Sequence, residues 1–177
     1  MKLLPAKGLY AITDCENHTT DHLIRKTKQI LQSGAVMLQY RNKYNDLATR
    51  ELQARELKIL CDNYNVPFII NDDIELAIAI NADGVHLGKG DRSCDMARVL
   101  IGEQMIIGIS CYNDLDRAIA AENTGATYIA FGAFFQTNTK KNTVRANPEL
   151  IQEAKQRLKL PVVAIGGITL ENGKLLA

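Results

Sequence analysis

The sequence predicts an α/β fold in which strands and helices alternate along one domain. Seven short runs rich in β-branched and aromatic residues recur along the 177 residues, with longer amphipathic segments between them. This alternation is typical of βα units and of a parallel sheet. Seven units exceed the roughly five or six strands that are usual in a doubly wound sheet, and no G-x-G-x-x-G follows the first run, so a Rossmann fold is disfavoured. We therefore predict a barrel of the TIM (β/α)8 type.

Each predicted strand is a short apolar run bounded by polar or turn-forming residues. In chain order, the strands are expected at residues 8–13, 35–40, 67–70, 83–86, 105–109, 128–131 and 161–165.

The segments between these strands are expected to be helical. A helix over residues 47–64 is predicted from four leucines that we interpret as its apolar face: Leu47, Leu52, Leu57 and Leu60. Asp114 is expected to cap the helix after the fifth strand, because a short polar side chain there accepts hydrogen bonds from backbone N–H groups. Gly34, Gly125 and the 81–84 stretch fall where helices should end.

The end of the chain departs from the pattern of a complete barrel. A TIM barrel has eight strands, whereas this sequence stops at Ala177 within the predicted seventh helix. We therefore expect one barrel domain over residues 1–177 that lacks the eighth strand. The C-terminal βα unit is then either lost from the protein or lies outside the sequence.

Composition excludes several classes of protein. The chain has 21 Lys and Arg against 20 Asp and Glu, with no basic run of the kind that binds nucleic acid or anionic membranes. No apolar run approaches the roughly 20 residues that span a bilayer, and no leader is recognisable at the start, so a cytoplasmic location is expected. The four cysteines form no C-x-x-C pair, so we expect reduced thiols rather than a zinc site or disulfides.

Polar residues follow the predicted strands, at the end where TIM barrels carry their active sites. Asp72 and Asp91 follow the third and fourth strands, and Mg²⁺ is held by one or two carboxylates with water and substrate phosphate. Arg41, Lys43 and Lys140 supply positive charge for an anionic group. Carboxylates and cations together indicate a site for a metal-bridged pyrophosphate.

A second phosphate site is predicted at the turn after the seventh strand, because the paired glycines Gly166 and Gly167 allow backbone N–H groups to approach a phosphate. These features also have simpler interpretations. Asp72 and Asp73 suit a helix N-cap, and taken alone that interpretation comes first. The glycines fit an ordinary turn, and Cys111 fits a packed thiol. The coincidence of polar groups after six successive strands favours the functional interpretation.

Together these motifs resemble the thiamine-phosphate synthase family. The similar segments lie in order along nearly the whole chain, at residues 9–14, 39–43, 70–72, 82–88, 108–110, 131–135, 137–140 and 163–168. The resemblance implies a TIM barrel that joins 4-amino-5-hydroxymethyl-2-methylpyrimidine diphosphate to a thiazole phosphate and releases pyrophosphate, with Mg²⁺ as cofactor. Its partners are small-molecule substrates, without nucleic acid or membrane, and self-association is left open.

Carried onto this sequence, the resemblance assigns roles to the polar residues at the strand ends. It gives the Mg²⁺ to Asp72 and Asp91. It implies that Gln39 orients the pyrimidine ring. It also implies that the diphosphate of the pyrimidine substrate is bound by Arg41, Lys43, Asn71, Ser110 and Lys140. It gives the thiazole phosphate to Thr137, Thr139 and Gly167. The expected catalytic groups are Arg41, Lys43, Ser110 and Lys140.

Three other functions are weighed against this one. A related thiazole tautomerase has no pyrophosphate to neutralise, so the Asp72 and Asp91 pair argues against it, as does the lack of a histidine beside Ser110. A non-catalytic binder of thiamin precursors is favoured only if the protein truly ends at Ala177. A sugar-phosphate epimerase needs bases at several strand ends, which His86 alone does not supply.

Overall fold

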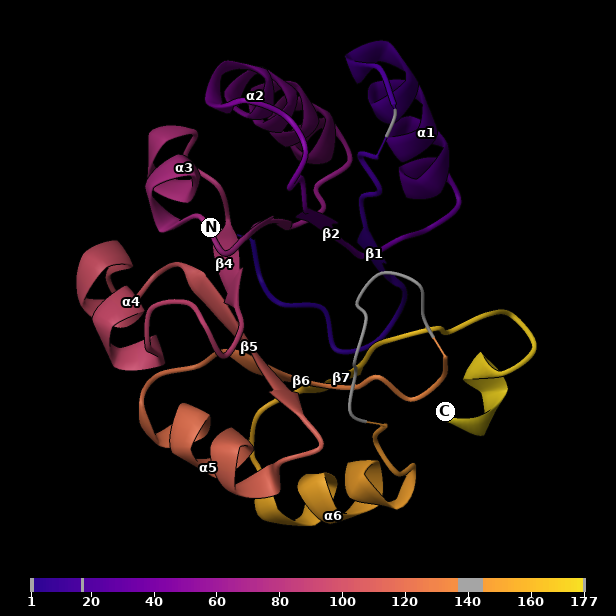
Figure 1. Ribbon diagram of the computed structural model, residues 1–177, viewed down its shortest axis with the longest axis vertical. Coiled ribbons are helices and arrows are strands. Elements are labelled where there is room, and N and C mark those ends of the chain that lie inside the picture. The colour runs from indigo at the N-terminus through magenta and orange to yellow at the C-terminus, as the bar shows by residue number, and fades with distance from the viewer. Residues whose placement is uncertain (1, 17, 137–144, 177) are drawn as a thin grey trace. The chain divides into compact units, whose positions relative to one another are not determined.

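The computed structural model describes residues 2–16, 18–136 and 145–176 of the chain. It comprises two compact units. Unit 1 contains Met1–His86 with Ile101–Ile106, and unit 2 contains Leu87–Leu100 with Ile107–Ala177. Strands and helices alternate through both units, as the sequence predicts (Figure 1).

Unit 1 is built on parallel strands paired in sequence order, with β1 beside β2, β2 beside β3 and β3 beside β4. The strands are β1 (Tyr10–Ile12), β2 (Met37–Tyr40), β3 (Phe68–Asn71) and β4 (Gly84–Leu87), the last with its final residue in unit 2. The helices are α1 (Thr20–Gln32), α2 (Leu47–Asn63) and α3 (Ile74–Ala79). Because the strands are parallel and adjacent, their carboxyl ends share one edge of the sheet.

The helices of unit 1 begin where short polar side chains satisfy free backbone N–H groups. Thr19 accepts a hydrogen bond from the amide of His22 at the start of α1, and Asp46 accepts one from the amide of Thr49 at the start of α2. α1 ends before Gly34, which has a φ of 91°. Gly34 therefore takes the left-handed conformation that the sequence predicts for this position.

The predicted apolar face of α2 is wrong. Leu57 is fully buried, but Leu47 and Leu52 are 74% and 54% exposed. The buried residues of this helix are instead Gln53, Ala54, Leu57 and Cys61. Steps of five residues turn a side chain about 140° around a helix, because each residue turns it by about 100°. Leu47, Leu52 and Leu57 therefore cannot share a face.

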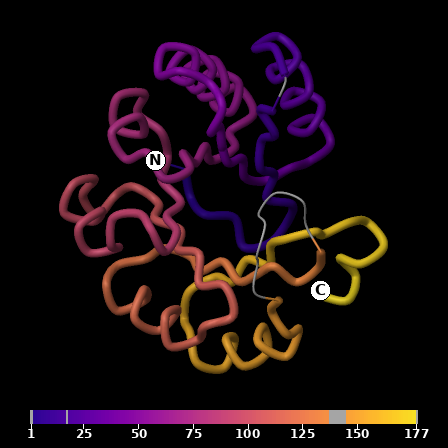
Figure 2. Tube along the Cα trace, in the orientation of Figure 1, coloured from indigo at the N-terminus to yellow at the C-terminus, as the bar shows by residue number. Residues whose placement is uncertain are grey.

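Unit 2 contains β5 (Ile106–Tyr112, its first residue in unit 1), β6 (Tyr128–Phe131) and β7 (Val162–Ala164), paired in parallel in this order. Its helices are α4 (Cys94–Ile101, its last residue in unit 1), α5 (Leu115–Asn123) and α6 (Glu149–Arg157), and a 3₁₀ turn, η1, covers Gly173–Leu175. Figure 2 draws the same trace as a tube, in which β6 is orange and β7 lies nearer the yellow C-terminal end of the colour scale.

Two details of unit 2 bear on the site. Asp114 caps α5, as predicted, by accepting a hydrogen bond from the amide of Arg117 at 2.8 Å. β5 runs three residues beyond its predicted end at residue 109, and its register with β6 shifts between Ser110 and Tyr112.

Within the described residues, no helix has the length and apolar character needed to cross a membrane.

Candidate active site

The side chain of Gln39 is fixed within β2. It is 2% exposed, and its amide nitrogen Nε2 donates a hydrogen bond of 2.7 Å to the hydroxyl of Tyr10 on the neighbouring strand β1. Strand pairing therefore sets the orientation of the residue that the resemblance assigns to the pyrimidine ring.

The backbone of Arg41 is held to the end of β1. The hydroxyl of Thr13 accepts a hydrogen bond from the Arg41 amide at 2.9 Å and donates one to the Arg41 carbonyl at 3.2 Å. The Thr13 amide also donates to the Gln39 carbonyl at 2.9 Å. Thr13 thus extends the pairing of β1 with β2 and fixes the point at which Arg41 leaves the sheet.

A buried polar network holds the loop after β2, which carries Lys43. The hydroxyl of Tyr40 and the amide of Asn42 both donate to Oε1 of Gln53, at 2.8 Å and 2.9 Å. Oδ1 of Asn42 accepts from the amides of Tyr44 and Asn45, which closes the loop. Burial raises the pKa of Tyr40 far above its ordinary value, so its hydroxyl keeps its proton and remains a donor. The sequence carries no clear sign of this network, because only the packing of α2 shows that Gln53 faces the core.

Gln53→Met is expected to lower the free energy of unfolding by about 2 kcal/mol. The substitution keeps the volume of the side chain but leaves two buried donors, on Tyr40 and Asn42, without their shared acceptor. The KM for the pyrimidine diphosphate that the resemblance assigns to this loop should also rise, because the loop loses an anchor. Urea denaturation and steady-state kinetics measure the two effects. Gln32→Met on the exposed face of α1 is the control, expected to change stability by less than about 0.5 kcal/mol.

The structure separates the roles of Asp72 and Asp73. Asp73 caps α3 by accepting from the amide of Leu76 at 2.9 Å, and it also pairs with Arg50 at 3.1 Å. Asp72 directly follows β3, has a φ of 64°, and places Oδ2 at 3.1 Å from Nζ of Lys43. The cap interpretation is thus confirmed for Asp73 only. Asp72 instead faces a cation at the carboxyl edge of the sheet.

Asp72 and the two cations after β2 give the strand ends of unit 1 a mixed charge. Asn71 ends β3, where it pairs with His86 of β4, and the Asp72 amide donates to the His86 carbonyl at 2.9 Å. The Lys43 and Asp72 side chains are 53% and 27% exposed, so solvent and a ligand can reach both. The exposed lysine can bind an anionic substrate there, and the carboxylate can bind a hard cation.

In unit 2, Asp91 lies in the loop that follows β4. One of its carboxylate oxygens, Oδ2, accepts a hydrogen bond of 2.6 Å from the amide of Gly88. Ser110, which is 7% exposed, lies near the end of β5 at the point where the register shifts. Both residues are at carboxyl ends of strands, as the sequence predicts.

The turn after β7 consists of two glycines in left-handed conformations, Gly166 with a φ of 93° and Gly167 with a φ of 63°. The carbonyl of Gly166 accepts from the amide of Phe135 at 3.1 Å, and the carbonyl of Gly167 accepts from Nδ2 of Asn172 at 2.9 Å. A Cβ atom on Gly167 would collide with the backbone of Gln136. The turn is therefore packed too closely for any residue with a side chain.

Three predicted site residues, Thr137, Thr139 and Lys140, lie outside the described residues. Among the residues described, no group of three or more His, Cys, Asp or Glu side chains is arranged to hold a metal. Mg²⁺ at a pyrophosphate needs only one or two carboxylates, because water and substrate oxygens complete its shell. Asp72 lies in unit 1 and Asp91 in unit 2, and their pairing on one ion remains a prediction.

All four cysteines are free and buried. Burial raises the pKa of both Cys61 and Cys111 to about 12 and also raises the pKa values of Cys15 and Cys94. The Cys111 thiol therefore stays protonated at pH 8, and the thiolate is the nucleophilic form. Cys111 is therefore a packed thiol, although it adjoins Ser110.

We expect the native protein to react slowly with Ellman's reagent at pH 8. Unfolding in urea exposes all four thiols and restores ordinary pKa values, so all four should then react within minutes. Absorbance reports the rate, and peptide mapping identifies the labelled residue. Rapid stoichiometric labelling of Cys111 in the native protein would contradict this assignment.

Successive βα units that carry carboxylates, cations and a glycine turn at the carboxyl ends of their strands define a phosphate-handling α/β enzyme of the TIM type. A family model described as thiamine monophosphate synthase matches residues 9–177. The chain belongs to this family, whose thiamine-phosphate synthases are transferases.

Individual relatives agree with this membership. The chain is 49% identical to a thiamine-phosphate synthase of Nitrosococcus oceani over 166 residues, covering 94% of this chain and 76% of that protein. It is 45% identical to one from Nitrosomonas eutropha, covering 99% and 82%. A thiamine phosphate pyrophosphorylase from Pyrococcus furiosus has a similar structure, with a TM-score of 0.83, 30% identity, and 94% and 78% of the two chains covered.

A sugar-phosphate epimerase also appears among similar structures. An N-acetylmannosamine-6-phosphate 2-epimerase from Clostridium perfringens gives a TM-score of 0.69 at 16% identity, with 97% and 82% of the chains covered. At that identity the likeness shows a shared fold alone. The Pyrococcus furiosus protein therefore resembles this chain in both fold and sequence, whereas the epimerase resembles it in fold alone.

Proposed function

We propose that this chain joins 4-amino-5-hydroxymethyl-2-methylpyrimidine diphosphate to a thiazole phosphate through a dissociative transfer. The bond between the methylene carbon and the diphosphate oxygen breaks first, and its electron pair leaves with pyrophosphate. The electron-rich aminopyrimidine stabilises the methylene cation. The thiazole nitrogen then attacks that carbon, so no protein nucleophile is needed.

The chain's own contribution is positioning and charge neutralisation. Arg41 and Lys43 extend from the loop after β2, where the Thr13 contacts and the buried network fix the backbone, and they face the departing diphosphate. Asn71, Ser110 and Lys140 complete that subsite in the proposal. Gln39 orients the pyrimidine ring, because its amide is already held by Tyr10.

The observation that carries the proposal is the ion pair between Lys43 and Asp72 at the carboxyl edge of unit 1, in a chain of this family. It brings together one residue assigned to the diphosphate and one assigned to Mg²⁺. Both side chains are partly exposed, so Lys43 can bind the diphosphate while Asp72 coordinates a metal ion.

Carboxylate oxygens fit Mg²⁺, and Asp72 and Asp91 are the residues proposed to hold it. Mg²⁺ would supply neutralisation of the charge that develops on leaving pyrophosphate. Thr137, Thr139 and the Gly167 backbone are proposed to bind the thiazole phosphate. A cytoplasmic location stays a prediction, and self-association stays open.

The test is product formation from defined substrates. Mass spectrometry should detect thiamin phosphate only when the pyrimidine diphosphate, the thiazole phosphate and Mg²⁺ are all present. Isomerisation of a thiazole carboxylate phosphate without the pyrimidine would instead identify a tautomerase. Binding of both substrates without any product would identify a non-catalytic binder.

A further inference from the structure

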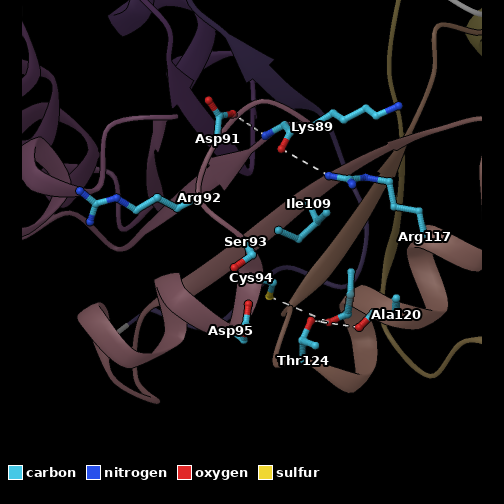
Figure 3. Close-up of a pocket in the computed structure, with 12 residues that line it drawn as sticks. Lys89, Asp91, Arg92, Ser93, Cys94, Asp95, Ile109, Arg117, Ala120 and Thr124 are labelled. Atoms are coloured by element: carbon cyan, nitrogen blue, oxygen red, sulfur yellow. Dashed lines mark hydrogen bonds between the residues drawn. The ribbon is translucent and has the colours of Figure 1, made fainter.

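Unit 2 contains a cavity of about 270 Å³ beside the loop that follows β4 (Figure 3). Lys89, Asp91, Arg92 and Arg117 contribute its charged wall, together with Asp95 at the start of α4. Arg117 comes from the first turn of α5 and reaches toward the loop that carries Lys89 and Asp91.

The guanidinium of Arg117 joins two separate pieces of backbone. Its Nε donates to the carbonyl of Ser110 at 2.9 Å, and its Nη2 donates to the carbonyl of Gly88 at 3.3 Å. A guanidinium holds its donors in a rigid planar fork, so the two carbonyls are fixed relative to one another. One belongs to the end of β5 and the other follows β4.

Gly88 connects Arg117 to Asp91. The carbonyl of Gly88 accepts from Arg117, and the amide of Gly88 donates to Oδ2 of Asp91 at 2.6 Å. The next residue, Lys89, donates its amide to the hydroxyl of Tyr112 at 3.3 Å. The loop with Asp91 is therefore held at Gly88 and Lys89, and both anchors arise from the segment between Ser110 and Arg117.

We propose that Arg117 is a positioning residue that holds the Asp91 carboxylate ready for a Mg²⁺–pyrophosphate ligand. This inference rests on the proposed function, because it takes Asp91 as a metal ligand. Groups that orient a metal ligand without touching the metal commonly change metal affinity by about 10–100-fold. Without Arg117, the loop must become ordered when the ligand binds. The entropy lost in that ordering lowers the affinity for the ligand.

Arg117→Met tests this by removing the donors while keeping much of the apolar stem. Calorimetric titration with inorganic pyrophosphate, with and without Mg²⁺, separates the metal-dependent part of binding from the rest. The variant should bind pyrophosphate in Mg²⁺ roughly 10–100-fold more weakly, with metal-free binding unchanged. The Mg²⁺ concentration for half-maximal turnover should rise by a similar factor. The kcat at saturating Mg²⁺ should fall by a smaller factor than this, because Arg117 also holds the backbone carbonyl of Ser110.

Arg98→Met is the matched control. Arg98 reaches from α4 to the carbonyl of Gly125 at 2.7 Å and to the hydroxyl of Thr127, which precedes β6. It thus makes the same kind of helix-to-backbone link in unit 2, but at the amino end of a strand. Arg98→Met should lower thermal stability about as much as Arg117→Met does. It should leave the Mg²⁺ dependence of pyrophosphate binding and of turnover unchanged.

Equal Mg²⁺ dependence in Arg117→Met and Arg98→Met would overturn the proposal and leave Arg117 a purely structural residue. Should Arg117→Met not fold, Arg117→Lys carries the same comparison, with an intermediate loss expected because a lysine restores charge but not the planar fork. If the unsubstituted protein shows no Mg²⁺-dependent binding or turnover, the proposed function itself fails. That result appears without any Arg117 variant, so the two failures are distinguishable.

Discussion

Asp72→Asn is expected to lower kcat/KM for the pyrimidine diphosphate by about 10²–10³-fold, which is the usual effect of removing one group that stabilises charge in a transition state. Asparagine tolerates the left-handed backbone of this position, whose φ is 64°, and it keeps the shape of the side chain. Only the negative charge is lost. Stability should change by less than about 1 kcal/mol, because the Lys43 ion pair that disappears is partly solvent-exposed.

The neighbouring residue provides a sharp control. Asp73→Asn keeps a good N-cap for α3, since asparagine and aspartate cap equally well, although it loses the charge facing Arg50. Its activity should stay within about threefold of the unsubstituted protein, a barrier change of less than about 1 kcal/mol. Steady-state pyrophosphate release over a Mg²⁺ series compares the two variants. Equal losses in both would refute the separate roles given to these adjacent carboxylates.

Gly167→Ala should lower the free energy of unfolding by about 2–4 kcal/mol, the sum of two costs. A left-handed conformation costs an alanine about 1 kcal/mol or more. The new Cβ would also collide with the backbone of Gln136, which cannot move aside as a flexible side chain can. The KM for the thiazole phosphate should rise as well, because the distorted turn belongs to the proposed phosphate site.

Gly34→Ala isolates the conformational part of that effect. Gly34 also has a positive φ, of 91°, but a Cβ added there would meet nothing within 4 Å. It should therefore cost only about 1 kcal/mol and leave the KM unchanged. Urea denaturation of both variants gives the difference. If Gly167→Ala is no more destabilising than Gly34→Ala, then close packing against Gln136 does not add to the cost of a side chain at Gly167.

Local sequence was sufficient to predict the alternation of strands and helices. All seven strands lie within or next to their predicted ranges, and Gly34 and Asp114 mark helix boundaries for the reasons predicted. Each of these depends on residues that are neighbours in the chain. The apolar face of α2 failed because its leucines recur at a spacing that does not match the helical period.

The site required tertiary information in three places. Asp72 and Asp73 are chemically identical neighbours, and only the left-handed turn at Asp72 gives one to the strand end and the other to the helix. The contact between Asn42 and Gln53 spans 11 residues and forms only when α2 packs. Arg117 looks like an ordinary residue in the first turn of a helix, because both of its acceptors are backbone carbonyls without a sequence signature.

Pyrophosphate release by the purified chain tests directly whether this protein joins two substrates in a Mg²⁺-dependent reaction. Both substrates are supplied with Mg²⁺, then with EDTA, then with EDTA and excess Mg²⁺, and each substrate is omitted in turn. Release should require both substrates, stop in EDTA and return when Mg²⁺ is restored. Release that persists in EDTA, or that needs only one substrate, would contradict the account, as would the absence of release under every condition.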